Sequence, residues 1–450
     1  MAGDGKRWDG TRNRERLLDH GPRALREDAI DIVEHAIRAA DPYVATMELL
    51  SLADDQLVCG GQAFDLREWE HIYVIGAGKA TQGIALALEE TLGSRIADGV
   101  VVLKRGESLQ LERIRVVEAA HPIPDEQSVR GGREVMALAR RTRRRDLVFG
   151  AITGGSSALL VLPPAGITLN DIQRLNEVLL ACGASIREIN AVRKHVSRIK
   201  GGRLGEAVCP AELINLTVSD VVGDALDYIT GPTVPDTSTV ADACSVLSKY
   251  GLWDAVPSSI RDHLRRGNQV ESPKSYSGRY HSLIVVPGDA ACRGAVDRSK
   301  RLGYEPCLLT TAMMGESREQ ALAFVKALGA DGGDPRAVIA GGETTVTITG
   351  ECGRGGPNQE FALSAAVAID GLERIVVVSV DTDGTDGPTH AAGGLVDGGT
   401  LDRACEAGHT AATALAIHGS LEFLEATGDL VVTGPTGTNV NDLKLLLTAA

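Results

Sequence analysis

A length of 450 residues exceeds one ordinary hydrophobic core and predicts two domains. The formal net charge of −14 argues against a nucleic-acid partner, because nucleic-acid-binding proteins present a basic face. The eight cysteines lack C-x-x-C spacing, so the sequence indicates neither a zinc site nor a disulfide framework. The first residues do not resemble a signal peptide and no apolar run approaches a membrane span, so we expect a cytoplasmic protein without a membrane partner.

Helical periodicity begins near the N-terminus, and strands then alternate with helices. Apolar residues recur at helical spacing over residues 23–40, and Pro42 ends the pattern. Four β-branched runs follow, each ending in a basic turn, glycine, serine or an acid: residues 72–75, 99–103, 146–152 and 213–218. Helices are expected at residues 169–182 and 189–195. This alternation predicts βαβ units and a mainly parallel sheet that binds ligands at the carboxyl ends of its strands.

A polar, turn-rich stretch at residues 256–280 predicts a domain boundary near residue 275. A second series of strands follows, at residues 282–286, 338–340 and 374–380. We therefore expect an N-terminal extension at residues 1–24, a first domain at residues 25–275 and a second domain at residues 276–450.

The first predicted strand leads into Gly76-Ala-Gly-Lys79 and a helix-forming stretch. Gly76, Gly78 and Gly83 miss the G-x-G-x-x-G spacing of a dinucleotide fingerprint, and only Gly78-Lys79 of a P-loop is present. A helix N-terminus attracts anions, and Lys79 adds positive charge there. Two interpretations stay open at this point: an anion site, and a tight turn with a solvated lysine.

A second glycine-rich segment follows the strand at residues 146–152. Gly154, Gly155, Ser156 and Ser157 offer backbone N–H groups and hydroxyls at the start of a predicted helix. Such a segment is either a nest for phosphate or carboxylate, or an ordinary helix N-cap. It is not G-x-S-x-G, so a serine-hydrolase elbow is not indicated.

Basic side chains are dense in residues 190–204, which is unusual in an acidic chain. This density is sufficient to neutralise a polyphosphate, and a solvated helix face is the alternative. Arg193 and Lys200 are the candidate anion ligands of this segment.

Acids follow two of the predicted strands. Asp220 comes just after residues 213–218 and can be a general base, a Mg²⁺ ligand or a helix cap, with Asp224 as a companion ligand or a solvated side chain. Asp383 and Asp386 lie in VDTDGTDG, which opens like a calcium loop but lacks the remaining features of an EF-hand. These acids either bind a Mg²⁺-nucleotide or form turns.

Arg354 stands among glycines in GRGGPNQE, just before a predicted helix. This setting suits an anion clamp on a mobile loop, and an ordinary hairpin turn is the alternative. Taken together, the motifs supply cations, glycine-rich nests and strand-end acids, which are the parts that phosphoryl transfer requires.

Ten motifs in order, from about residue 25 to the C-terminus, closely resemble the glycerate 2-kinase family, whose C-terminal half is called the MOFRL domain. They are GAGKA (76–80), HPIPDEQSV (121–129), TGGSSAL (153–159), VRKHVSRIKGGRL (192–204), SDVVGD (219–224), GPTVPD (231–236), GGETTVT (341–347), GRGGPNQE (353–360), DTDGTDGP (381–388) and TGPTGTNVNDL (433–443). Each motif alone is weakly specific, and the collinear series is highly specific.

The resemblance implies an α/β fold of two domains: an N-terminal Rossmann-like parallel sheet with flanking helices and a C-terminal α/β MOFRL domain, with the active site in the cleft between them. It implies ATP- and Mg²⁺-dependent phosphorylation of the 2-hydroxyl of D-glycerate, giving 2-phosphoglycerate and ADP. The family's catalytic residues map to Lys79, Asp220 and Arg354. The expected cofactor-binding residues are Gly76, Gly78, Gly154, Gly155, Ser156, Ser157, Lys200, Glu343 and Asn358. The expected metal ligands are Asp220, Asp224, Asp383 and Asp386.

Two other functions are the alternatives to this kinase. The family was once described as hydroxypyruvate reductase, but a nicotinamide site would need the third glycine that this turn lacks. A non-catalytic sensor of small carboxylates is disfavoured by the presence of Lys79, Asp220 and Arg354 together. The expected partners are D-glycerate and ATP, and a homodimer is the assembly considered.

Overall fold

The computed structural model describes residues 8–106, 111–219, 230–328, 335–348, 350 and 352–449. The chain forms two compact units. The parallel-sheet unit is Pro42–Val286, and the mixed-sheet unit combines the chain before Pro42 with the chain after Val286. No helix in the described ranges is long and apolar enough to cross a membrane.

The parallel-sheet unit contains a six-stranded sheet in the order β6-β5-β4-β7-β8-β9, in which every neighbouring pair is parallel. Its strands are β4 (His71–Ala77), β5 (Ile96–Lys104), β6 (Ile114–Ala119), β7 (Asp146–Ile152), β8 (Glu212–Val218) and β9 (Tyr280–Val286). All residues of β7 and β8 are buried, as expected for a parallel sheet covered on both faces. The strand order is that of the Rossmann fold, and it reverses between β4 and β7. The predicted Rossmann-like sheet is thereby confirmed.

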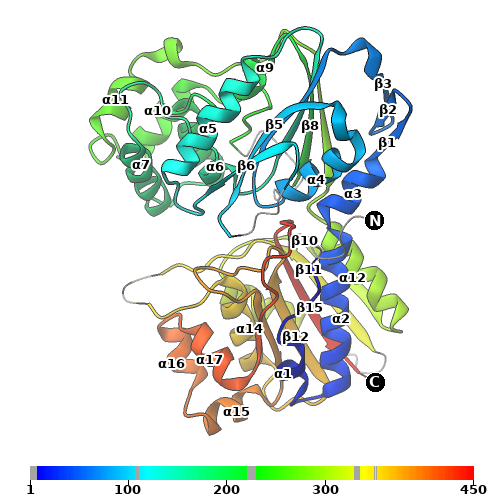
Figure 1. The fold of residues 1–450 in the computed structure, drawn as a ribbon. Coiled ribbons are helices and arrows are strands. Elements are labelled where there is room, and N and C mark those ends of the chain that lie inside the picture. Colours follow the sequence, from blue (N-terminus) through cyan, green and yellow to red (C-terminus); the bar gives the residue numbers. More distant parts are fainter. Residues whose placement is uncertain are drawn as a thin grey trace. The chain divides into compact units, whose positions relative to one another are not determined.

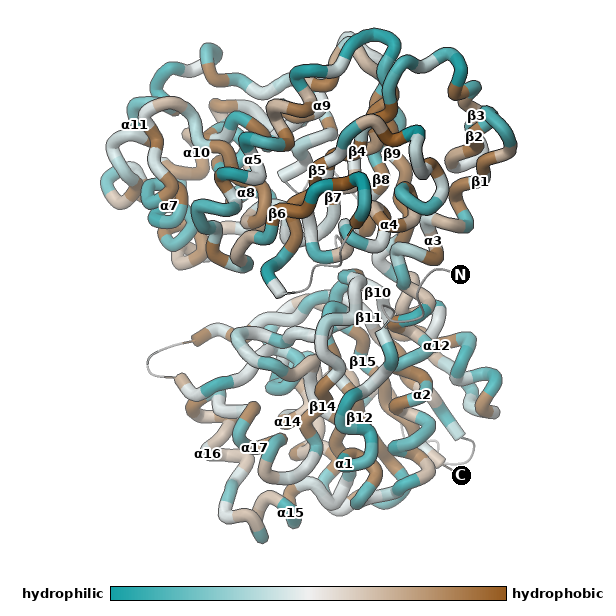
Figure 2. Tube along the Cα trace, in the orientation of Figure 1, coloured by the Kyte–Doolittle hydropathy of each residue, from teal (hydrophilic) through white to brown (hydrophobic). Residues whose placement is uncertain are grey.

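Helices cover this sheet and form a second core beside it (Figure 1). The helices are α3 (Pro42–Leu49), α4 (Thr81–Leu92), α5 (Glu126–Ala139), α6 (Ser156–Leu159), α7 (Leu169–Ala181), α8 (Ile186–His195), α9 (Arg203–Val208), α10 (Val240–Lys249) and α11 (Ser258–Leu264), with 3-10 turns η1 (Leu66–Glu68), η2 (Gly93–Arg95) and η3 (Gly267–Val270). A small antiparallel sheet comprises β1 (Leu50–Ala53), β2 (Gln56–Cys59) and β3 (Gln62–Asp65). Helices α5 and α9 contribute to the core of the large sheet, whereas α7, α8, α10 and α11 pack mainly on one another. Hydrophobic residues follow the strands of the sheet in Figure 2.

The mixed-sheet unit has a six-stranded sheet in the order β10-β11-β15-β12-β13-β14, in which only β10 and β11 pair in parallel. Its strands are β10 (Glu305–Met313), β11 (Arg336–Gly342), β12 (Ile375–Asp381), β13 (Gly393–Asp397), β14 (Leu430–Val431) and β15 (Asp442–Thr448). Its helices are α1 (Arg14–Leu18), α2 (Arg23–Ala39), α12 (Ala290–Arg301), α13 (Ser317–Lys326), α14 (Pro357–Ala368), α15 (Thr400–Glu406), α16 (Ala411–Ala416) and α17 (Ser420–Thr427). Helix α14 belongs to the main core of this unit, with α13 and α17.

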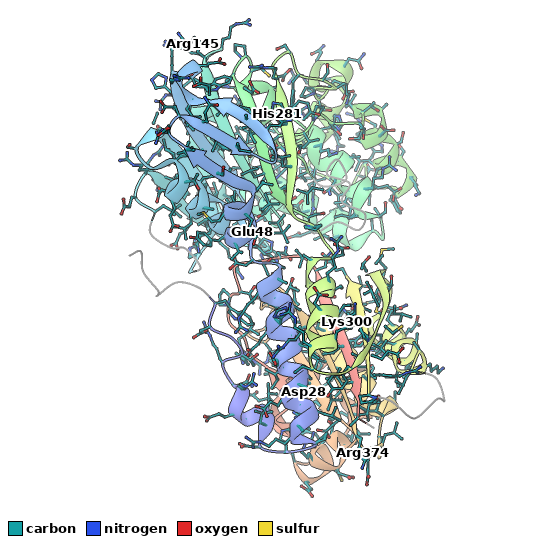
Figure 3. All side chains as sticks on the ribbon, turned by 90° about the vertical axis from the view of Figure 1, so that its right-hand side faces the viewer. Asp28, Glu48, Arg145, His281, Lys300 and Arg374 are labelled. Atoms are coloured by element: carbon teal, nitrogen blue, oxygen red, sulfur yellow. The ribbon has the colours of Figure 1, made fainter. Side chains whose placement is uncertain are left out.

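Helix α2 lies side by side with α12, although 250 residues of chain separate them (Figure 1). Figure 3 labels Asp28 and Lys300 on these neighbouring helices. The Tyr304 hydroxyl donates to Asp28 (2.7 Å), and Arg298 pairs with Asp31. Buried Arg26 of α2 is held by two further acids of this unit, Asp397 and Asp429.

The division into units differs from the sequence prediction at both ends of the first domain. The prediction placed residues 25–40 in the first domain and residues 282–286 in the second. In the structure α2 packs in the mixed-sheet unit, and β9 pairs with β8 as an edge strand of the parallel sheet. The physical reason is that local periodicity identifies an amphipathic helix or a strand but not the surface on which it packs.

Candidate active site

The carboxyl ends of β4 and β7 form the centre of the candidate site, because the strand order reverses between them. β4 ends in the Gly76–Lys79 turn before α4, and β7 ends in the Thr153–Ser157 turn before α6. The Lys79 N–H donates to the Gly154 carbonyl (2.8 Å), which ties the two turns together. The structure therefore brings two predicted glycine-rich segments to the place where open α/β sheets bind ligands.

Close packing of the two turns depends on Thr153 and on glycine. The Thr153 hydroxyl accepts a hydrogen bond from the Ala80 N–H (3.1 Å). Gly78 has a φ of +142°, and any Cβ there would overlap the Thr153 hydroxyl. A Cβ on Gly76 would overlap the Ala151 carbonyl oxygen. These glycines therefore let one turn lie directly against the other, which is why the motif departs from dinucleotide spacing.

Backbone N–H groups at this edge are available to an anion. Within the described ranges, the N–H groups of Gly154 and Gly155 form no hydrogen bond. Helix α4 begins at Thr81 and presents at the same edge the N–H groups that a helix start leaves without intrahelical partners. Lys79 is half-buried beside them. This combination of N–H donors and one cation can hold a phosphate or a carboxylate.

His121 lies at the same turns, although the sequence predicted no role for it. A Cβ on Gly155, whose φ is +84°, would lie 3.1 Å from Lys79 Cγ and 3.3 Å from His121 Nε2. The Lys79 and His121 side chains therefore both pack close to Gly155. The available signal was the HPIPD motif, which follows β6 and so reaches the same edge of the sheet.

Lys200, an expected cofactor ligand, instead supports the Thr153–Ser157 turn from within the protein. Its ammonium group donates to the carbonyls of Ser157 (2.6 Å) and Leu160 (2.9 Å), at the end of α6. Its residue surface is only 6% exposed. Burial and, to a smaller extent, the charge of Arg193 together lower the pKa of Lys200 to about 7. The Ser157 hydroxyl lies 2.9 Å from the Thr230 hydroxyl, and Ser156 is buried, so both serines also fix this turn.

Most of the remaining basic segment forms an internal network rather than a solvated helix face. Lys194 pairs with Asp236 (2.9 Å), and both side chains are buried. His195 lies 2.8 Å from Glu271, and Asp236 also accepts from the Ser272 hydroxyl (2.7 Å). A cavity of about 460 Å³ borders Lys194 between α8 and α10, away from the glycine-rich turns. These contacts join the basic segment to the GPTVPD motif.

Two of the expected catalytic and metal residues, Asp220 and Asp224, lie outside the described residues. β8 ends at Val218, next to β7 in the sheet.

Arg354 belongs to the mixed-sheet unit, where its loop is closely packed. Its side chain is 69% exposed, and its Nε donates to Glu422 (2.7 Å) on α17. Its carbonyl accepts from the Leu421 N–H (3.0 Å). A Cβ on the flanking Gly355 would overlap the Ser420 hydroxyl, and one on Gly356 would overlap Asp386. The glycines therefore allow the loop to pack closely against its neighbours, whereas the sequence analysis expected them to make the loop mobile.

Asp386 caps helix α14, so the structure does not support it as a metal ligand. One carboxylate oxygen accepts from the Asn358 N–H and the other from the Gln359 N–H, both at 2.9 Å. The amide groups of both side chains donate to the same oxygens. Burial raises the pKa of Asp386 to about 6, although these hydrogen bonds favour the charged form. Both oxygens are thus committed to the helix start.

Asn358, an expected cofactor ligand, is buried in a polar network behind this cap. Its side chain donates to Asp442 (2.8 Å) and accepts from the Ser379 hydroxyl (2.6 Å). Asp442 in turn pairs with the fully buried Lys444 (2.5 Å), which lies over the Phe361 ring. The sequence did not predict this network, whose members come from two strands and one helix.

The remaining expected ligands lie at strand ends of the mixed-sheet unit. The Asp383 carboxylate accepts from the Thr385 N–H (2.7 Å), as in a turn, and the residue is largely buried. Glu343 is exposed, and its N–H donates to the Met313 carbonyl (2.9 Å). The Asp383 contact agrees with the turn interpretation.

One group of side chains in the described ranges has spacing suited to a metal: His20, Asp397 and Asp429. Arg26 and Arg403 each pair with both carboxylates. Two guanidinium groups already balance the two acids, so this group is an ion-pair network of α2 and the sheet.

Comparison with known proteins adds to this geometry. Residues 28–265 match the family described as "Domain of unknown function (DUF4147)", and residues 336–442 match the MOFRL family. The glycerate 2-kinase of Pyrococcus horikoshii is 42% identical over 94% of this chain and 97% of its own length. The crystal structure of a Thermotoga maritima glycerate kinase superposes with a TM-score of 0.79 at 38% identity, covering 95% of this chain and all of that chain. A relative from Agrobacterium vitis that carries the name of a hydroxypyruvate reductase is 39% identical over 92% of this chain and 93% of its own.

Fold and site together define a two-unit α/β enzyme with two glycine-rich turns at the switch point of a Rossmann-order sheet. The chain belongs to the glycerate 2-kinase family, which confirms the resemblance of its motifs.

Proposed function

We propose that this protein phosphorylates the 2-hydroxyl of D-glycerate with ATP and Mg²⁺, giving 2-phosphoglycerate and ADP. The observation that carries the proposal is the contact of the Gly76–Lys79 turn with the Thr153–Ser157 turn at the sheet switch point. The available N–H groups of Gly154 and Gly155, with Lys79, form a cradle for phosphate, and a Cβ on Gly155 would crowd Lys79 and His121.

The proposed roles follow from the chemistry of each group. Lys79 neutralises charge on the phosphates, and the turn N–H groups orient them. Asp220 accepts the proton of the 2-hydroxyl or orients that hydroxyl, as a positioned carboxylate can. Arg354 stabilises charge on the transferring phosphoryl group through its planar, bidentate donors. Its present partner is a single exposed carboxylate, so exchange for phosphate costs little.

Mg²⁺, when bound, neutralises charge on the nucleotide phosphates. We propose Asp220, Asp224 and Asp383 to hold it. Asp383 lies just after β12 and carries carboxylate oxygens, the type of donor that Mg²⁺ prefers.

Product analysis tests the proposed function. The purified protein receives D-glycerate, ATP and Mg²⁺, and the product is measured with enolase alone or with enolase plus phosphoglycerate mutase. We expect the signal with enolase alone, because only 2-phosphoglycerate feeds enolase directly. A signal that requires the mutase would refute the regiochemistry.

The two other functions give different results in the same experiment. A reductase would oxidise NADH with hydroxypyruvate, and a carboxylate sensor would bind D-glycerate without turnover. The name of the Agrobacterium vitis relative makes the NADH measurement necessary. A cytoplasmic location and a homodimer remain predictions of the sequence.

A further inference from the structure

The roles proposed for Lys79, Asp220 and Arg354 do not explain why Lys200 is buried in the parallel-sheet unit. Its ammonium group lies at the end of α6 and donates to the carbonyls of Ser157 and Leu160. Ser157 closes the turn that carries the available N–H groups of Gly154 and Gly155. Lys200 thus fixes the carbonyl side of the segment whose N–H side faces the ligand position.

The charge of Lys200 has no balancing acid in the described part of the chain. Arg193 of α8 is the charged group that acts on it, and this second cation is itself largely removed from solvent. The groups around these two cations are neutral: Asn176 of α7, Ser197, Ser157 and Thr230. Two cations without a carboxylate are costly in a protein interior, and an anion nearby would offset that cost.

Other charged groups near this segment are already paired or directed elsewhere. Arg203 donates to the carbonyl of Lys200 (3.2 Å) and to that of Lys194 (2.8 Å). Asp236 pairs with Lys194 and accepts from Ser238 and Ser272. The uncompensated positive charge therefore belongs to Lys200 and Arg193.

We propose that Lys200 is a positioning residue that holds the Thr153–Ser157 turn and takes up a proton from solvent when the phosphates of ATP occupy this turn. This inference rests on the proposed function. Burial lowers the pKa of Lys200 to about 7 in the structure, so at pH 8 most of the amine is neutral. A bound anion favours the charged form, so nucleotide binding moves a proton from the buffer to Nζ.

Titration calorimetry of the intact protein with the Mg²⁺ complex of adenylyl imidodiphosphate tests this inference. Measurements at pH 8 in two buffers of different ionisation enthalpy give the number of protons taken up. We expect uptake approaching one proton per nucleotide, because a group of pKa about 7 is mostly deprotonated at pH 8. Lys200→Gln keeps an N–H donor for a carbonyl but carries no charge, so it should abolish this uptake and weaken the Kd about tenfold.

Lys194→Gln is the matched control. Lys194 lies in the same segment and is 4% exposed, but its charge is balanced by Asp236. We expect this variant to keep both the proton uptake and the Kd, with circular dichroism confirming the fold of each variant.

Three outcomes would overturn the inference: no proton uptake by the unmodified protein, uptake that persists in Lys200→Gln, and equal loss in both variants. Should Lys200→Gln not fold, the proton uptake of the unmodified protein at pH 6 and pH 8 decides, since uptake by Lys200 must be larger at pH 8. The enolase-coupled assay keeps the proposed function separate. Kinase activity without proton uptake refutes only the role of Lys200, and absence of nucleotide binding refutes both.

Discussion

Replacing Gly155 by alanine tests whether turnover depends on the positions of Lys79 and His121 against the Thr153–Ser157 turn. Gly166 provides a matched control, because both glycines have a φ of +84°. The methyl group of Gly155→Ala would lie 3.1 Å from Lys79 Cγ and 3.3 Å from His121 Nε2. At Gly166 no atom lies within 4 Å of the corresponding position. The pair therefore shares a left-handed φ, and the contacts of the new methyl group differ between the two sites.

The shared strain should lower the free energy of unfolding by about 1–2 kcal/mol in both variants, because an L side chain disfavours the left-handed region. Only Gly155→Ala also displaces side chains. Carbon atoms prefer separations of about 3.5–4.0 Å, so Lys79 must move by a few tenths of an ångström. A misplacement of about 1 Å can cost on the order of 10²-fold in rate, and we therefore expect about a tenfold loss of kcat/KM.

Urea denaturation and the enolase-coupled assay measure the two effects separately. Gly166→Ala should lose stability and keep its activity, whereas Gly155→Ala should lose both. Activities of the two variants within twofold of each other would refute the reasoning. In that case the position of Lys79 against this turn would not matter for turnover.

Four further predictions follow from the described contacts. Lys79→Ala should lower kcat/KM by on the order of 10²-fold or more in steady-state kinetics, because it removes charge stabilisation, and near-native activity would exclude Lys79 from the site. Arg354→Lys should lower kcat by on the order of 10³-fold, because lysine lacks the bidentate donors of arginine. Its melting temperature should stay unchanged, since the ion pair of Arg354 with Glu422 is exposed. A kcat within about threefold of that of the unmodified protein would contradict the prediction. Asp386→Ala should lower the free energy of unfolding by about 3 kcal/mol in urea titrations, because the buried start of α14 loses its cap, and its Mg²⁺ dependence should stay unchanged. Burial lowers the pKa of Lys200 to about 7, so above pH 7 the unfolded chain binds more protons than the folded protein. The free energy of unfolding of the unmodified protein should therefore rise with pH relative to that of Lys200→Gln, by at most about 1.4 kcal/mol per pH unit. A difference between the two proteins that stays constant from pH 7 to pH 9 would count against this pKa.

The sequence predicted β7 and β8 well, because these strands are buried on both faces, whereas β6 was not predicted. Residues 146–152 coincide with β7, and residues 213–218 fall within β8. Both are mainly apolar or β-branched runs, followed by Thr153-Gly154 and by Ser219. The glycine-rich turns could therefore be placed at strand ends, and the parallel topology then brings them to one edge.

Side chains whose partners lie far away in the sequence could not be placed in the same way. Lys444 interrupts the apolar pattern of β15, and only the structure shows that buried Asp442 pairs with it. Lys200 looked like an exposed ligand because its acceptors, two backbone carbonyls, leave no signal in the sequence. Asp386 looked like a metal ligand because a helix cap and a metal site use the same carboxylate.

The position of β15 in the mixed sheet affects how the chain folds during its synthesis. β15 lies between β11 and β12, yet it follows every other strand of this sheet in the chain. A ribosome releases the complete parallel-sheet unit long before residues 442–448 emerge, so that unit can fold first. Helix α2 is synthesised earlier still, and its apolar face stays exposed to solvent until the later elements of its unit are made. A nascent chain that stops before β15 therefore exposes the edges of β11 and β12, which makes it a substrate for chaperones and proteases.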